Sequence, residues 1–496
     1  MIYILGVDQS TQGTKAILFN EKGEIFARAD RGHRQIVNEK GWVSHDAEEI
    51  YQNVISASRD VVGLSGISKT DIAAIGISNQ RETTVAWDFW GKPIGEAIVW
   101  QCNRAKEISD ELKSHAELIR KKTGLPLSPY WPASKMAWLL RHIISESKYY
   151  LGTIDSWLVF KLTGNKAFKC DYSNASRTQL FNLHDLKWDE EICGLFGIPV
   201  NSLPDVCDSN STFGLTDLDG FLDKEIPICG VIGDSHGSMF GQGCHRPGMI
   251  KTTYGTGSSI MMNIGAEFLL SKNGLATSLA WGIDGEVTYV LEGNINYTGA
   301  VMTWLQDNVK LIQSPREIEM AIKAANPEDT TILVPAFSGL GAPHWNPGAK
   351  AMLCGMTRSS GRNEIIKAAE ESIAFQINDV LQAMESDSGI AIGQVYADGR
   401  PTKDKYLMQF QSDISCVKMG VRREDELSAM GAAYLAGLAQ GIYTMEELFG
   451  SVERTYYSPK MPEKTKLEKC ERWDKAVKLV SSLARQLVNN SGASNF

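Results

Sequence analysis

The feature that most constrains the fold lies at the start of the chain, where two β-prone apolar runs, residues 2–7 and 16–19, are joined by a polar turn. This pattern predicts a β-hairpin. The turn holds a carboxylate, hydroxyls, a glycine and a lysine, at Asp8, Ser10, Thr11, Gly13 and Lys15. Hydroxyls and backbone N–H groups in a tight turn can cradle phosphate oxygens, and a nearby carboxylate can hold Mg²⁺ through water. An ordinary polar turn explains the segment equally well.

Composition excludes several classes of protein. A chain of 496 residues exceeds one typical core and predicts two or more domains. Its net charge of −9 argues against a nucleic-acid or anionic-membrane partner. No apolar run is long enough to cross a bilayer, and no basic segment of a signal peptide follows Met1. The nine cysteines form no Cys-x-x-Cys pair, which favours a reducing, cytoplasmic location without a zinc site or disulfide framework.

The order of predicted elements indicates two α/β halves, residues 1–247 and 248–496. The first half alternates strands with helices, one of which starts after the capping residue Asp46 and runs to about residue 62. The second half again opens with strand–turn–strand, and its turn carries Gly255 and Thr256. Each half thus begins with a turn whose hydroxyls and backbone N–H groups could bind phosphate. This arrangement predicts a nucleotide site between the halves.

Two common nucleotide motifs are missing. A Walker A loop needs glycine directly before lysine, but Thr14 separates Gly13 from Lys15. The segment 255–257 lacks the third glycine of a dinucleotide fingerprint and leads into a strand, which disfavours a nicotinamide enzyme.

Polar residues at strand ends are the other candidates for chemistry. Arg81 and Glu82 can grip neighbouring hydroxyls, or form an exposed ion pair. Trp100 suits a stacking wall or the core. Asp234, which follows a buried strand and Gly233, suits a general base, a metal ligand or a helix N-cap.

Segments in order along nearly the whole chain carry a family pattern, among them residues 76–84 (GISNQRETT), 97–101 (AIVWQ), 171–181 (DYSNASRTQLF), 253–257 (TYGTG) and 335–345 (PAFSGLGAPHW). In these segments the chain resembles the FGGY carbohydrate kinases and, within them, the glycerol kinases. A further family signature at residues 353–371 fits except at Glu370, where an apolar residue is usual. We attribute that difference to helix packing.

The resemblance implies an α/β fold of two actin/Hsp70/hexokinase-like (ribonuclease H-like) domains with the active site in the cleft between them. It implies ATP-dependent phosphorylation of a primary hydroxyl of a small polyol, with glycerol, converted to glycerol 3-phosphate, as the leading substrate. By position, Asp234 resembles the catalytic base and Asp8 the Mg²⁺-associated carboxylate. The implied substrate set is Arg81, Glu82, Trp100, Tyr130, Asp234, Ser235 and Ser259, and the implied nucleotide set is Ser10, Thr11, Lys15, Gly255, Thr256, Gly399, Arg400 and Asp404. Such kinases commonly form homodimers or homotetramers.

Departures from the family pattern leave the substrate and the nucleotide preference open. Ser235 stands where glutamine is usual, and Ser259 where phenylalanine is usual. Both changes shorten the side chain, so a larger polyol or ketose such as erythritol, xylulose or ribulose is an alternative substrate. In the adenosine loop, Arg400 replaces a glycine and Asp404 an asparagine. The neighbouring His236 is expected to be a surface or capping residue.

A function of another class is a catalytically silent sugar sensor on the same fold. The presence of both Asp8 and Asp234 argues against it.

Overall fold

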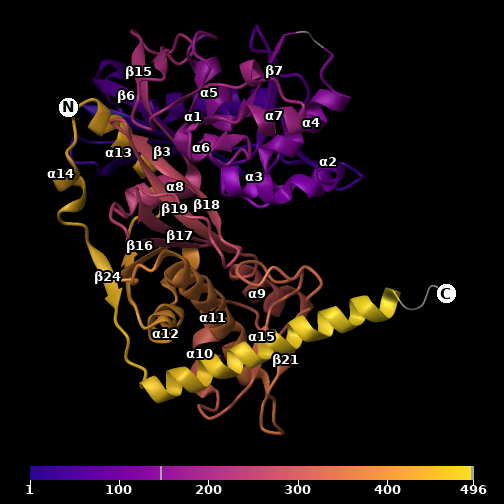
Figure 1. Ribbon diagram of the computed structural model, residues 1–496. Coiled ribbons are helices and arrows are strands. Elements are labelled where there is room, and N and C mark those ends of the chain that lie inside the picture. The colour runs from indigo at the N-terminus through magenta and orange to yellow at the C-terminus, as the bar shows by residue number, and fades with distance from the viewer. Residues whose placement is uncertain (146–147, 493–496) are drawn as a thin grey trace.

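The computed structural model describes residues 1–145 and 148–492 and contains two large mixed sheets (Figure 1). The N-terminal sheet has six strands in the order β14-β15-β6-β1-β2-β3. Strands β1, β2 and β3 are antiparallel neighbours, whereas β6 runs parallel to both β1 and β15. Their bounds are β1 Tyr3–Gln9, β2 Gly13–Phe19, β3 Ile25–Gly32, β6 Ile72–Asn79, β14 Gly214–Thr216 and β15 Ile226–Gly233.

The C-terminal sheet has seven strands in the order β18-β19-β17-β16-β22-β23-β24. Here β19, β17 and β16 are antiparallel neighbours, and β22 runs parallel to β16 and β23. Five strands of this sheet thus repeat the order and directions of β3-β2-β1-β6-β15. The bounds are β16 Met249–Tyr254, β17 Ser258–Gly265, β18 Ala276–Ile283, β19 Glu286–Ile295, β22 Gln394–Asp398, β23 Lys418–Arg422 and β24 Arg454–Tyr457.

Smaller sheets and helices surround the two sheets. A five-stranded sheet contains β4 Ile36–Val37, β5 Val43–His45, β7 Thr84–Asp88, β8 Ala97–Ile98 and β9 Tyr149–Thr153. Strand pairs are β10 Lys169–Asp171 with β13 Asp205–Cys207, β11 Phe181–Asn182 with β12 Lys187–Trp188, and β20 Ile332–Val334 with β21 Met352–Cys354. The α-helices are α1 Ala47–Ser65, α2 Lys106–Glu111, α3 Ala116–Thr123, α4 Pro132–His142, α5 Ile154–Leu162, α6 Tyr172–Ala175, α7 Glu190–Phe196, α8 Asp234–Gly241, α9 Gly299–Thr303, α10 Arg316–Ala324, α11 Arg362–Ser388, α12 Lys405–Ser415, α13 Leu427–Ala439, α14 Met445–Phe449 and α15 Glu463–Gly492.

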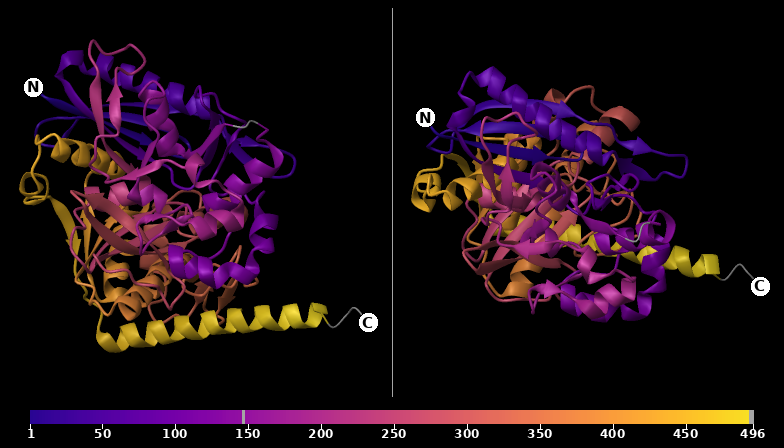
Figure 2. Two further views of the ribbon diagram at one scale, coloured as in Figure 1. Left: turned by 45° about the horizontal axis from the view of Figure 1, so that its top comes forward. Right: turned by 90° about the horizontal axis from the view of Figure 1, so that it is seen from above.

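Helices α1 and α15 differ in what holds them in place. Helix α1 follows Asp46, whose carboxylate accepts the backbone N–H groups of Glu48 and Glu49 at 2.9 and 3.3 Å, so the predicted N-cap is confirmed. Helix α15 lies along the C-terminal half, and its end projects beyond the body (Figure 2). It docks through Trp473, which is 1% exposed, whereas Leu483 is 46% exposed.

Helices α8 and α13 connect the two sheets. Helix α13 comes from the C-terminal part of the chain, yet it packs on β1, β6 and β15 of the N-terminal sheet and on α8. The approach is close: a Cβ atom on Gly431 would lie 1.9 Å from the carbonyl oxygen of Gly237, and one on Gly76 would lie 2.2 Å from that of Ala432. The packing therefore requires glycine at these positions. The predicted domain boundary, between residues 247 and 248, falls between α8 and β16 and stays a prediction.

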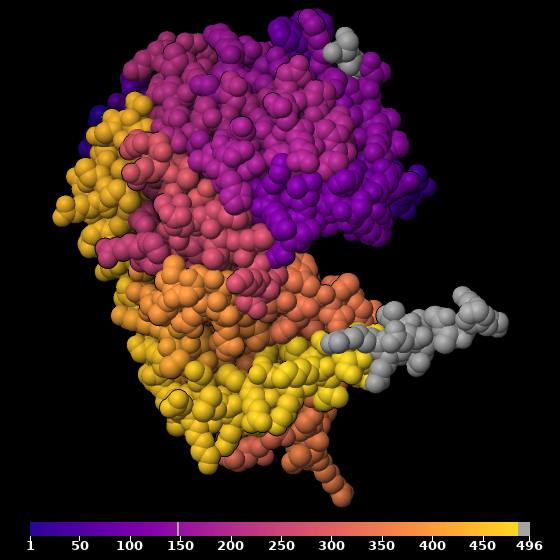
Figure 3. Space-filling view, viewed as in Figure 1, coloured from indigo at the N-terminus to yellow at the C-terminus, as the bar shows by residue number. Residues whose placement is uncertain are grey.

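The surface is hollowed between the violet N-terminal half and the orange C-terminal half (Figure 3). In the described part of the chain, no helix combines the length and apolar character needed to span a membrane.

Candidate active site

The N-terminal hairpin has a shorter turn than the sequence predicts, because β1 extends to Gln9 and β2 starts at Gly13. Asp8 and Lys15 therefore lie opposite each other in the ladder, with the Lys15 Nζ 3.6 Å from Asp8 Oδ2. Ser10 closes the turn by donating to the Gly13 carbonyl oxygen from both its N–H, at 2.8 Å, and its hydroxyl, at 3.0 Å.

Asp8 is almost enclosed, with 6% of its surface exposed. Burial raises the pKa of this carboxyl to about 6, although Lys15 partly offsets the effect and Asp234 adds to it. The hydroxyl of Ser78 donates to Asp8 Oδ1 at 3.1 Å. A proton, or a cation, at this carboxylate relieves the cost of its burial.

Lys15 is held by the C-terminal part of the chain. Its Nζ lies 2.7 Å from Oε2 of Glu426, the residue before α13, and Arg28 contacts the other oxygen of the same carboxylate. The predicted phosphate-contacting lysine is thus tied to the helix that lies between the sheets.

Asp234 lies where β15 meets α8. The helix begins at Asp234 itself, with Gly233 in the cap position, so Asp234 is not the N-cap. Its Oδ1 accepts the N–H of Ser235 at 2.6 Å and the Nε–H of Arg81 at 3.0 Å. The side chain is 36% exposed, which leaves it accessible to a substrate.

Arg81 is the centre of the predicted substrate set. Its Nη1 and Nη2 each donate to one oxygen of Glu292 at 3.0 Å, and Nη2 also donates to the Ser235 hydroxyl at 3.2 Å. Ser259 donates its hydroxyl to the same Glu292 carboxylate at 3.2 Å. Arg81, Asp234, Ser235 and Ser259 are therefore brought together.

The rest of the substrate set joins through Glu82 and two aromatic rings. The Tyr130 hydroxyl lies 3.4 Å from Glu82 Oε2, and the ring centroids of Tyr130 and Trp100 are 5.8 Å apart. The Trp100 Nε1–H donates to the Thr11 hydroxyl at 3.0 Å, which links this set to the hairpin. The opposite oxygen of Glu82 accepts the Nε–H of Arg177 at 2.6 Å.

The second turn and the predicted adenosine loop adjoin each other. Gly255 and Thr256 are exposed at the turn between β16 and β17. Gly399 has φ +94°, and a Cβ there would lie 2.0 Å from the Tyr254 carbonyl oxygen, so only glycine suits this contact. Arg400 is exposed at the start of a short 3₁₀ helix.

Asp404 has a clear structural task in that loop. It caps α12 by accepting the N–H groups of Tyr406 and Leu407 at 2.7 and 3.0 Å. The nearby Glu370 is buried in α11, and burial followed by the charge of Asp404 raises its pKa to about 8. The departures from the family pattern at residues 370 and 404 are therefore electrostatic neighbours.

The expectation for His236 is wrong. The ring is fully buried, with Nε2 3.5 Å from the Ser278 hydroxyl on β18, because α8 is covered by the second sheet and by α13. Burial, and then the charge of Arg81, lowers the pKa of His236 well below its usual range.

Three buried charged residues of the site, Arg177, Glu292 and Glu426, were not predicted from the sequence. Arg177 contacts both Glu82 and Glu292, and Glu426 pairs with Lys15. Burial by itself disfavours the charge on Glu292, but Arg177 and Arg81 outweigh it and hold the pKa of that carboxyl well below its usual range. One sequence signal was available: Glu292 interrupts an apolar strand.

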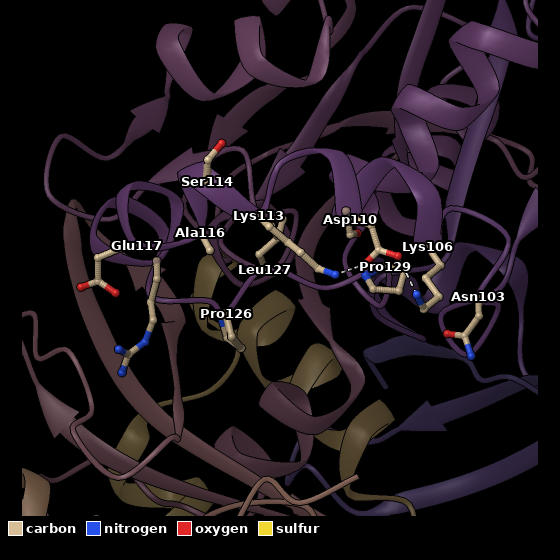
Figure 4. A pocket seen from close by; sticks show the side chains of 12 residues that line it. Asn103, Lys106, Asp110, Lys113, Ser114, Ala116, Glu117, Pro126, Leu127 and Pro129 are labelled. Atoms are coloured by element: carbon tan, nitrogen blue, oxygen red, sulfur yellow. Dashed lines mark hydrogen bonds and ion pairs between the residues drawn. The ribbon is translucent and has the colours of Figure 1, made fainter. Parts of the chain in front are cut away.

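A cavity of about 650 Å³ lies outside the predicted substrate and nucleotide sets, none of whose residues line it (Figure 4). It is formed by α2, α3 and the segment 126–129 that leads to Tyr130. Lys106 and Lys113 both point toward Asp110, at 2.6 and 3.0 Å, so a single carboxylate balances one of the two positive charges.

Comparisons with known proteins decide the family. Residues 3–241 match the N-terminal domain of the FGGY family of carbohydrate kinases, and residues 250–440 match its C-terminal domain. The chain belongs to the FGGY family of carbohydrate kinases. The predicted family, the enzyme class and the two-domain actin-like fold are thereby confirmed.

Similar proteins cover nearly the whole length of this kinase. A glycerol kinase from Alkaliphilus oremlandii is 44% identical over 96% of both chains. The crystal structure of Plasmodium falciparum glycerol kinase with ADP is 35% identical, with a TM-score of 0.91 over 97% of this chain and 98% of that one. A xylulose kinase structure from Lactobacillus acidophilus, 23% identical, shares the fold with a TM-score of 0.86 over 100% and 99% of the two chains.

Proposed function

We propose that this kinase transfers the γ-phosphoryl group of ATP to a primary hydroxyl of a small polyol, with glycerol as the leading substrate. The observation that carries the proposal is that Arg81 contacts Asp234 while the adjacent Glu82 meets Tyr130, whose ring packs against Trp100. Arginine and carboxylate groups donate to and accept from neighbouring hydroxyls, and the two aromatic rings give the carbon chain an apolar wall. Glycerol kinases are also the relatives at 44% identity.

Asp234 is the general base in this proposal. Phosphoryl transfer depends on positioning and charge neutralisation more than on covalent chemistry. The carboxylate accepts the proton of the attacking hydroxyl, while the Arg81 Nε–H at 3.0 Å fixes its orientation. Closure of the two halves then excludes water and limits hydrolysis of ATP.

The ATP phosphates meet two turns. Ser10, Thr11 and Lys15 of the first hairpin, and Gly255 and Thr256 of the second, supply hydroxyls, backbone N–H groups and one positive charge. Gly399 packs against the Tyr254 carbonyl beside the second turn, and it is assigned to the nucleoside together with Arg400 and Asp404, which follow it in the chain. To bind a phosphate oxygen, the Lys15 ammonium group must give up part of its ion pair with Glu426.

Asp8 is assigned to Mg²⁺. Its carboxylate is the kind of oxygen donor that Mg²⁺ prefers, directly or through water, and a cation there would offset the burial that raises the pKa of Asp8 to about 6. When bound, Mg²⁺ would neutralise charge on the phosphates.

A second candidate is a kinase for a larger polyol or a ketose. It is favoured by the short side chains of Ser235 and Ser259. The Ser235 hydroxyl is hydrogen-bonded to Arg81, and the Ser259 hydroxyl is hydrogen-bonded to Glu292. A catalytically silent sensor is disfavoured because both carboxylates that transfer needs in this proposal, Asp8 and Asp234, are present.

The test is ATP consumption with glycerol, erythritol, xylulose and ribulose. The primary proposal predicts a kcat/KM for glycerol at least about tenfold above the others, which is about 1.4 kcal/mol of discrimination. A preference of that size for a four- or five-carbon substrate supports the second candidate. Asp234→Asn should abolish transfer while ATP still binds, and unchanged turnover would remove the base assignment.

The proposal includes a cytoplasmic location and homodimeric or homotetrameric assembly. The nine cysteines are free thiols, which suits a reducing compartment. Sedimentation analysis of the purified chain measures the assembly.

A further inference from the structure

A chain of buried charges, Arg81–Glu292–Arg177–Glu82, links the two halves of this kinase. Glu292, on β19 of the C-terminal sheet, receives both Nη groups of Arg81 at 3.0 Å and also contacts Arg177. Arg177 in turn donates its Nε–H to Glu82 at 2.6 Å. The side chains of Glu292 and Arg177 are 0% and 1% exposed.

Glu292 binds the two Nη groups of Arg81, which are the groups best suited to bind a carboxylate. A guanidinium presents paired N–H groups that favour bidentate carboxylate binding. Because the two Nη groups are taken by Glu292, Arg81 meets Asp234 through Nε alone, and that bond falls on Oδ1. Without Glu292, the same fork would be available to Asp234 or Glu82.

Arg177 provides the second link. Its guanidinium lies 4.7 Å from the Trp131 ring centroid, while Nη2 is buried without a hydrogen-bond partner among the described residues. Trp131 packs edge-on against Tyr130 at 4.7 Å between ring centroids. Arg177 thus contacts the two side chains, Glu82 and Trp131, that flank Tyr130.

We propose that Glu292 and Arg177 are positioning residues for the polyol site. Glu292 holds Arg81 so that one N–H orients Asp234, and Arg177 holds Glu82 facing Tyr130. Because Glu292 belongs to the C-terminal sheet and its partners to the N-terminal half, alignment of the polyol-binding side chains depends on contact between the halves. This inference rests on the proposed polyol kinase activity.

The test compares Glu292→Gln and Arg177→Lys with the wild type. Glutamine keeps the size of Glu292 but cannot balance two guanidinium groups, and lysine keeps the charge of Arg177 without its fork. Loss of a charge-assisted bond that positions the site predicts a polyol KM raised about tenfold or more, with the KM for ATP changed less than about threefold. The shift in melting temperature induced by the polyol should shrink in parallel.

Glu371→Gln is the matched control. Glu371 is also a buried glutamate of the C-terminal half, and it accepts from the Tyr406 hydroxyl at 2.7 Å and from Lys469 Nζ at 3.0 Å. Its substitution removes a buried ion pair away from the polyol site, so it should lower the melting temperature and leave the polyol KM unchanged.

The outcomes separate the two proposals. A folded Glu292→Gln variant with wild-type polyol KM overturns the positioning role. If Glu292→Gln does not fold, Arg177→Lys is judged by the same criterion. If neither variant folds while Glu371→Gln does, the positioning role is also overturned, and Glu292 and Arg177 have a structural role instead. If the wild type turns over no substrate but still shows a polyol-induced melting shift, the kinase proposal fails, and loss of that shift in the variants still supports the positioning role.

Discussion

Asp8→Asn should make this kinase more stable at neutral pH and inactive at the same time. The carboxylate is 6% exposed, and its pKa rises from 3.8 to about 6, mainly through burial. Asparagine has nearly the same shape, and it can accept the Ser78 hydroxyl that lies 3.1 Å from Asp8 Oδ1. It cannot supply the negative charge that Mg²⁺ requires.

The magnitude follows from the pKa shift. A rise from 3.8 to about 6 corresponds to about 3 kcal/mol against the ionised form in the native state. Since the folded pKa is the higher one, the favourable contribution of the protonated carboxyl is complete below pH 3.8 and is lost as the pH rises through about 6. At pH 7.5 the wild type bears this cost and Asp8→Asn does not, whereas at pH 4 the difference nearly disappears.

Two measurements check this reasoning. Thermal or urea unfolding at pH 7.5 should show Asp8→Asn as stable as the wild type or more so, by at most about 3 kcal/mol. For the wild type, kcat/KM for MgATP, corrected for ionisation of the nucleotide, should fall about tenfold from pH 7 to pH 5, as the ionised fraction of Asp8 drops from about 90% to about 10%.

Either of two results would refute the reasoning. If Asp8→Asn is clearly less stable than the wild type at pH 7.5, the Asp8–Lys15 pair outweighs the burial cost. If kcat/KM is flat between pH 7 and pH 5 while the protein stays folded, the ionisation of Asp8 does not limit the reaction.

Two further predictions concern packing and pH-dependent stability. Gly76→Ala places a Cβ 2.2 Å from the Ala432 carbonyl oxygen and should cost about 1–3 kcal/mol by displacing α13, whereas Gly63→Ala, with no atom within 4 Å, should be neutral or stabilising in unfolding measurements. Equal loss in both variants would contradict the packing argument. The pKa of Glu370 rises from 4.5 to about 8, so the stability contributed by its protonated carboxyl is complete below pH 4.5 and is lost as the pH rises through about 8; the stability advantage of Glu370→Gln over the wild type should therefore grow by about 2 kcal/mol between pH 6.5 and pH 9.5. A stability difference independent of pH would show that Glu370 is not protonated in the native state.

Local rules worked where the relevant contacts are close in sequence. Asp46 caps α1 because its carboxylate reaches N–H groups two and three residues ahead. The hairpin turn was likewise predictable, although its exact length was not: β1 and β2 extend until the ladder bonds end, which placed Asp8 inside a strand. Burial of His236 was not predictable, since it depends on the second sheet and α13 covering α8.

The sequence by itself determined the reaction class, through family-like segments that run in order along nearly the whole chain and include the hairpin of Asp8, the glycine turn of the second half and Asp234 after a buried strand. Only the tertiary structure decided how those parts are held. Glu292 meets Arg81 across 211 residues, and Glu426 meets Lys15 across 411. Nothing in the spacing of these charges along the chain predicts such contacts, because they form only when two sheets and the α8–α13 pair bring distant segments together in a buried, low-dielectric region.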